Sequence, residues 1–128
     1  MNNTSAVSIN ILGRDYPLKL SVNAMQKIKE LYGGVGGAAE RLQANGDVIE
    51  RLQIAAALLS ILATEGARAR NYEFQNEEPL PDLPVEVTGT VLTVADLNKI
   101  IPKIVKAINE GMGREIFSED DEKNTPGA

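Results

Sequence analysis

The sequence contains no cysteine, no histidine and no tryptophan, and only three tyrosines and two phenylalanines among its 128 residues. The absence of cysteine excludes disulfides and thiolate sites. The absence of histidine also removes the usual general base and the commonest transition-metal ligand. The remaining carboxylates include no inward-facing acid of the kind that burial could tune for catalysis. We therefore expect a protein that is not an enzyme and that holds no cofactor or metal.

Basic patches are also absent. The formal net charge is −5, and residues 118–128 supply −3 of it, since they hold four acids and one lysine: Glu119, Asp120, Asp121, Glu122 and Lys123. Residues 1–117 therefore carry nearly equal numbers of positive and negative charges, and they cannot neutralise several phosphates. We expect neither nucleic acid nor an anionic membrane surface as a partner.

Long apolar runs are missing as well. The longest, Ile54–Ala63, has about half of the roughly 20 residues that a membrane-spanning helix needs. The N-terminal letters MNNTSAVS show neither the positive region nor the apolar core of a signal peptide. We therefore expect the protein to stay in the cytoplasm in which it is made.

Alternating apolar residues near the N-terminus predict a β-hairpin over residues 7–20. Pro17 has no backbone N–H, so it must occupy a non-hydrogen-bonded pair. A four-residue loop, Leu12–Asp15, meets this requirement, whereas a two-residue Gly13–Arg14 loop does not. The predicted pairs, which place all six apolar side chains on one face, are Ile11 with Tyr16, Ile9 with Leu18, and Val7 with Leu20.

Apolar spacing and capping signals predict four helices, over residues 22–32, 38–44, 48–65 and 94–109. Ser21 caps the first helix and Gly33 ends it. Because an isolated hairpin is marginal in water, we expect this helix to cover the hairpin. Gly66 is predicted to end the third helix, and Thr93 to cap the fourth. Pro102 predicts a kink in the fourth helix or its division into two shorter ones.

The segment between the third and fourth helices has no clear periodicity. Residues 67–75 interleave Arg68 and Arg70 with Tyr72 and Phe74, and are predicted to be irregular or briefly extended. Two arginines are too few for single-stranded nucleic acid, which leaves rings packed on the core or a protein-binding edge. Residues 76–89 contain three prolines and are predicted to form an extended connection. Connections of this length in a compact domain are usually functional or mobile.

These elements predict a single domain over residues 1–117, followed by an acidic, disordered tail over residues 118–128. The fold class is mainly α with an N-terminal β-hairpin, forming a bundle of about four helices. The third helix has apolar residues on two sides, so it lies centrally in the core or uses one side for self-association or partner binding. For the second interpretation the candidate residues are Ile54, Leu58, Ile61, Ile100 and Ile104.

One segment resembles a known family. Residues Ile9–Leu20 follow the pattern I-x-I-L-G-R-x-Y-P-L-x-L, and the next helix contains A-M-Q-K-I-K-E-L-Y-G-G. Together they resemble the tail assembly chaperones of long-tailed bacteriophages. The resemblance is strongest over Val7–Gly34, and AINEGMGREI at Ala107–Ile116 is also similar. These motifs are structural, so they transfer no individual functional residue.

The resemblance implies a small, helical, non-catalytic protein of the infected bacterial cytoplasm that is absent from the mature virion. Such proteins bind the tape measure protein and help to recruit tail tube subunits. In many relatives a translational frameshift adds a C-terminal extension that contacts the tube protein. The implied protein is a homo-oligomer that binds neither nucleic acid nor membrane. The alternative is a structural phage component, such as a head–tail adaptor or a tail terminator.

Overall fold

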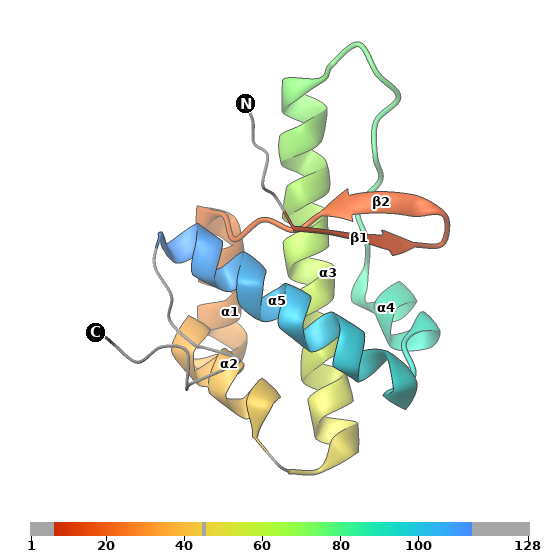
Figure 1. Ribbon diagram of the computed structural model, residues 1–128. Helices are drawn as coiled ribbons and strands as arrows, with labels where there is room; N and C mark the ends of the chain where they lie inside the picture. Colours follow the sequence, from red (N-terminus) through yellow and green to blue (C-terminus); the bar gives the residue numbers. More distant parts are fainter. Residues whose placement is uncertain (1–6, 45, 114–128) are drawn as a thin grey trace, which may run out of the picture.

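The computed structural model describes residues 7–44 and 46–113, which fold into a hairpin and a set of helices around one long helix (Figure 1). This arrangement confirms the predicted class, mainly α with an N-terminal β-hairpin. The predicted acidic tail, residues 118–128, lies outside the described residues. The elements are β1 (Ser8–Ile11), β2 (Arg14–Pro17), α1 (Val22–Tyr32), α2 (Val35–Gln43), α3 (Val48–Glu73), α4 (Val85–Val91), a 3₁₀ turn η1 (Val94–Asp96) and α5 (Leu97–Met112).

The hairpin turn is tighter than predicted. Ile11 lies opposite Arg14, so the loop is Leu12–Gly13 alone. Leu12 and Gly13 have φ angles of 54° and 82°, as in a type I′ turn, whose twist suits paired strands. The predicted four-residue loop and its pairs are therefore wrong by two residues, and Ile9 rather than Ile11 faces Tyr16. A shift of two keeps every side chain on its predicted face.

Pro17 lies opposite Ser8 in this register. The Leu18 N–H donates to the Val7 carbonyl at 2.8 Å, and hydrogen-bonded pairs alternate with non-hydrogen-bonded ones along an antiparallel ladder. The Ser8–Pro17 pair is thus non-hydrogen-bonded, as Pro17 requires. The physical constraint was correct, but the Leu12–Gly13 turn satisfies it with a shorter loop.

Helix α3 is the central element, and it contacts α1, α2, α4, α5 and β2. It begins at Val48 and is capped by Asp47, whose side chain accepts a hydrogen bond from the Ile49 N–H at 2.9 Å. It does not end at Gly66, as predicted, but continues to Glu73. Residues 67–73 are therefore helical rather than irregular.

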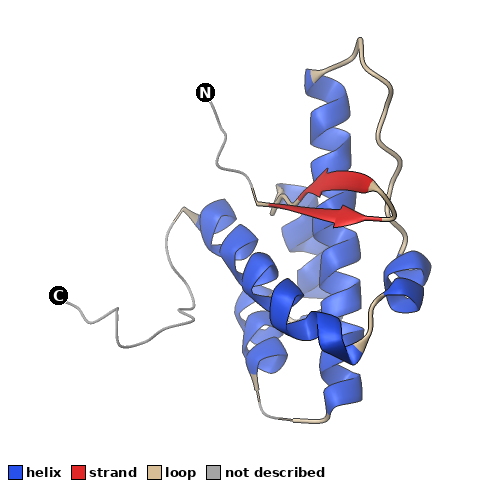
Figure 2. Cartoon of the chain, turned by 45° about the vertical axis from the view of Figure 1, so that its right-hand side comes forward, coloured by secondary structure: helices blue, strands red, loops and turns tan. Residues whose placement is uncertain are grey.

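The hairpin packs across α3, and not under α1 as predicted (Figure 2). The Lys19 N–H donates to the Leu62 carbonyl at 3.1 Å. The Pro17 carbonyl comes so close to Gly66 that a Cβ built there would lie 1.7 Å from the oxygen. Gly66 is therefore a contact point between strand and helix, and its small size is used for packing rather than for termination.

The remaining helices differ from the prediction in detail. Helix α2 begins at Val35, before the predicted residue 38, so it includes Gly36 and Gly37. Helix α4 was not predicted, because it lies within the proline-punctuated segment. Thr93 caps the 3₁₀ turn η1, which leads directly into α5, and the Thr93 N–H donates to the Asp96 carboxylate at 2.8 Å. Helix α5 itself begins at Leu97, three residues after the predicted start. Pro102 lies within one continuous helix, α5, so the alternative of two shorter helices is wrong.

One buried polar side chain fastens α4 to the centre. Thr88 is fully buried, and its hydroxyl lies 2.8 Å from the Ala56 carbonyl on α3. A second acceptor, the Val85 carbonyl, is 3.1 Å away. This hydroxyl therefore satisfies its hydrogen-bonding need while holding α4 against α3.

Candidate functional site

The five residues predicted as a partner-binding surface lie in or against the core. Ile54, Leu58, Ile100 and Ile104 are 3%, 0%, 4% and 0% exposed, and Ile61 is half-buried against the core. Helix α3 is apolar on two sides because elements pack on it from several directions. Central burial is thus the interpretation that the fold supports, and an exposed surface built from these residues is a wrong prediction.

A shallow groove opens instead between α2, α3 and α5. Its volume is about 250 Å³, and its lining combines apolar with polar side chains: Gln43, Arg51, Leu97, Asn98, Ile101 and Pro102. Leu97 is buried, whereas Ile101 and Pro102 are half-buried and present apolar surface. Pro102 also has no N–H for the Asn98 carbonyl four residues earlier, which leaves that acceptor without its usual helical donor.

Arg51 places a positive charge at this groove. Its Nε donates to the Leu42 carbonyl at 3.1 Å, which ties α3 to the last turn of α2 and satisfies one of the carbonyls left open there. Among the ion pairs within residues 7–44 and 46–113, none involves Arg51. An apolar floor beside a fixed guanidinium suits a partner that combines an apolar side chain with a carboxylate.

The connection from α3 to α4, which we call the strap (residues 74–84), is fixed along α3. The Asn71 side chain bonds the Leu80 backbone in both directions, at 2.8 and 2.9 Å. Thr64 accepts from the Leu83 N–H at 2.9 Å, and Ser60 donates to the Leu83 carbonyl at 2.7 Å. The strap is therefore extended, as predicted, but it is held by side chains of α3.

Two arginines of α3 strengthen this attachment. Arg68 bonds both carboxylate oxygens of Asp82, at 3.1 and 2.7 Å, and Arg70 pairs with Glu77 at 2.7 Å. The hydrogen bond from Arg68 lowers the pKa of Asp82 below its ordinary value of 3.8. Burial opposes this lowering of the pKa, and the charge of Arg68 adds to it. The two arginines thus hold the strap against α3.

Asp82→Asn is expected to reduce stability at neutral pH by no more than about 1 kcal/mol, because the ion pair is exposed. The folded pKa of Asp82 lies below its unfolded value, so its contribution is present above about pH 4 and is lost as the pH falls through the folded pKa. Urea unfolding at pH 7 and pH 3 should show a smaller difference between the variant and the wild type at pH 3. Glu40→Gln, at an exposed position of α2, is the control, and an equal loss there would contradict the assignment.

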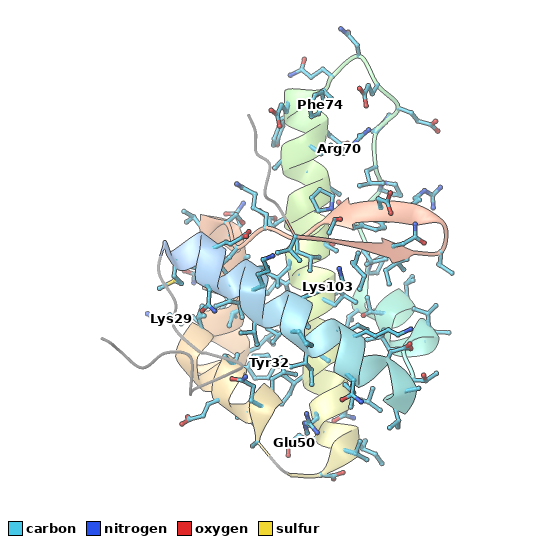
Figure 3. All side chains as sticks on the ribbon, in the orientation of Figure 1. Lys29, Tyr32, Glu50, Arg70, Phe74 and Lys103 are labelled. Carbon is cyan, nitrogen blue, oxygen red and sulfur yellow. The ribbon has the colours of Figure 1, made fainter. Side chains whose placement is uncertain are left out.

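The two aromatic rings at the end of α3 do not pack on the core. Tyr72 is 77% exposed and Phe74 is 46% exposed. Figure 3 shows Phe74 and Arg70 at the end of α3 that projects beyond the hairpin. The prediction that these rings pack on the core is therefore wrong, and a protein-binding edge remains a prediction.

No family model, no curated protein and no solved structure matches this chain. In the described part of the chain, none of the helices is both long and apolar enough to cross a membrane. Within the same residues, no three acidic, histidine or cysteine side chains are grouped so that they could hold a metal ion.

Proposed function

We propose that this protein is a non-catalytic tail assembly chaperone of a long-tailed bacteriophage. It binds the tape measure protein and helps to recruit tail tube subunits in the bacterial cytoplasm, and it is absent from the finished virion. The observation that carries the proposal is the residue order of Ile9–Leu20 followed by α1, which resembles these chaperones. In the fold these residues are the two strands, the Leu12–Gly13 turn and the capped helix, so they define the scaffold.

The groove supports this proposal as a binding surface. An amphipathic helix binds a groove through a few apolar anchors spaced along one side. A volume of about 250 Å³ is below the usual size of a small-molecule site and suits one or two anchoring side chains. Ile101 and Pro102 would contact such an anchor, and Arg51 would pair with a neighbouring acid. Many weakly bound copies, or a homo-oligomer, could coat a long tape measure by multivalency.

Ile101→Asp is the variant that tests the groove. Burying an isoleucine contributes about 1.5–3 kcal/mol, and an unpaired carboxylate at the same place adds a desolvation penalty. We therefore expect at least about a tenfold loss of affinity when the full chain is titrated with the purified tape measure protein of the same phage. Circular dichroism of the variant should show unchanged helix content.

Lys27→Asp is the matched control, because it adds a carboxylate to the exposed side of α1. It should leave the affinity unchanged. Equal binding by the Ile101 and Lys27 variants would exclude the groove, whereas failure of the wild-type chain to bind would exclude the chaperone function itself. Detection of the protein in purified virions by mass spectrometry would favour a head–tail adaptor or a tail terminator.

A further inference from the structure

The exposed side of α5 carries a row of three lysines, Lys99, Lys103 and Lys106, which we call the lysine stripe. Their spacings of four and three residues place them on one side of the helix, and all three are exposed. In Figure 1, α5 crosses the front of the molecule, over α1 and α3. The stripe therefore lies on an open face.

Within the described residues, the lysine stripe has no acidic partner. The four ion pairs found there all belong to arginines. Lys103 donates to the Ser8 carbonyl of β1 at 2.9 Å, as its position beside β1 in Figure 3 allows. Its ammonium group keeps two further donors. Glu110, four residues after Lys106, forms no ion pair with it, and the order of lysine before glutamate is the weaker one in a helix.

The chain itself supplies a complementary charge. It continues for 15 residues beyond Gly113, from 114 to 128, and includes four consecutive acids, Glu119–Glu122. Along α5, at about 1.5 Å per residue, Lys106 and Lys99 lie roughly 10 and 21 Å before Gly113. An extended chain covers about 3.3 Å per residue, so Glu119 and Glu122 reach roughly 20 and 30 Å beyond Gly113. The acidic run can therefore reach all three lysines.

We propose that the acidic run Glu119–Glu122 docks on the lysine stripe of α5 in the same chain. Each exposed ion pair is weak by itself, but a short tether gives an effective concentration of about the millimolar range, so several weak pairs act together. The proposal does not depend on the chaperone function.

The test uses the full-length chain, whose lack of cysteine makes Asn124→Cys a unique attachment point for a spin label. The label broadens nearby amide signals in the NMR spectrum of the isotope-labelled protein. We expect loss of the amide signals of residues 99–106 at low ionic strength. They should recover in about 1 M salt, where the Debye length is about 3 Å. They should also recover when Lys99, Lys103 and Lys106 are all changed to Gln.

The matched control is Lys27→Gln with Lys29→Gln, which removes two exposed lysines from α1 and should leave the broadening unchanged. Neutralising the acidic run with Glu119→Gln, Asp120→Asn, Asp121→Asn and Glu122→Gln should abolish it. Signals of α5 that stay sharp at low salt, or broadening that survives loss of the three lysines, would overturn the proposal. Broadening of an isotope-labelled chain by a separate spin-labelled copy would assign the stripe to a second copy instead.

Discussion

Gly66→Ala is expected to destabilise the fold by about 3 kcal/mol, the upper end of the usual range for overpacking. A Cβ at this position would lie 1.7 Å from the Pro17 carbonyl oxygen and 2.5 Å from its carbon. Both of those atoms are backbone, so no side chain can rotate away, and β2 must move off α3. Thermal unfolding should show a melting temperature lower by roughly 10 °C.

Gly89→Ala is the matched control for that substitution. Gly89 also lies within a helix, α4, but a Cβ there would meet nothing within 4 Å. Alanine is favoured over glycine in a helix by up to about 1 kcal/mol, so this variant should be as stable as the wild type or slightly more stable. Similar melting temperatures for the two variants would show that the hairpin does not approach α3 at Gly66.

Local sequence rules predict some features of the hairpin but not its register. Alternation identified the two strands, and the missing N–H of Pro17 identified the type of pair it occupies. These rules allowed two registers that differ by two residues, and both keep the apolar side chains on one face. The structure selects the one that requires a positive φ at both Leu12 and Gly13. Glycine suits such a turn, but a positive φ is unusual for a bulky residue such as leucine, so Leu12 concealed this register.

The length of α3 depends on tertiary contacts in a way that a local pattern cannot reveal. A glycine after an apolar stripe indicates a helix end, so the sequence pattern predicts that α3 ends at Gly66. The composition after it did contain a signal, because Ala67, Arg68, Ala69 and Arg70 are good helix formers. The extra turns carry Arg68, Arg70 and Asn71, which hold the strap.

The sequence gives little indication of helix α4 or of the groove. Residues 85–91 are rich in β-branched side chains, which have low helix propensity, so the helix depends on packing and on the buried Thr88 hydroxyl. The groove joins residues from α2, α3 and α5. Its residues are therefore far apart in the sequence, and only the helix arrangement brings them together. Ile101, which lies beside the buried Ile100 in the sequence, is half-buried at the groove.

The two apolar sides of α3 raise a question that periodicity alone leaves open. A second apolar side can face a partner or another part of the same chain. In the fold, α3 has neighbours on several sides, and Leu58 and Leu59 are both fully buried although they point in different directions from the helix. The choice between core and interface is therefore testable at Leu58.

Leu58→Ala is expected to destabilise the fold by about 3 kcal/mol, within the usual range of about 2–5 kcal/mol for a buried leucine. The substitution removes apolar contacts and leaves a cavity where surrounding helices cannot fully collapse. Urea unfolding followed by circular dichroism should show a lower midpoint with an unchanged slope. The mass in solution, measured by light scattering on the folded variant, should equal that of the wild type.

Ile49→Ala is the matched control on the same helix, because Ile49 is 61% exposed and its truncation should change stability by no more than about 0.5 kcal/mol. If Leu58 instead formed a self-association surface, its truncation would leave the monomer fold intact and lower the mass in solution. That outcome would assign Ile54 and Leu58 to a self-association surface instead of the core. A loss of stability at Leu58 without a change of mass assigns both residues to the core.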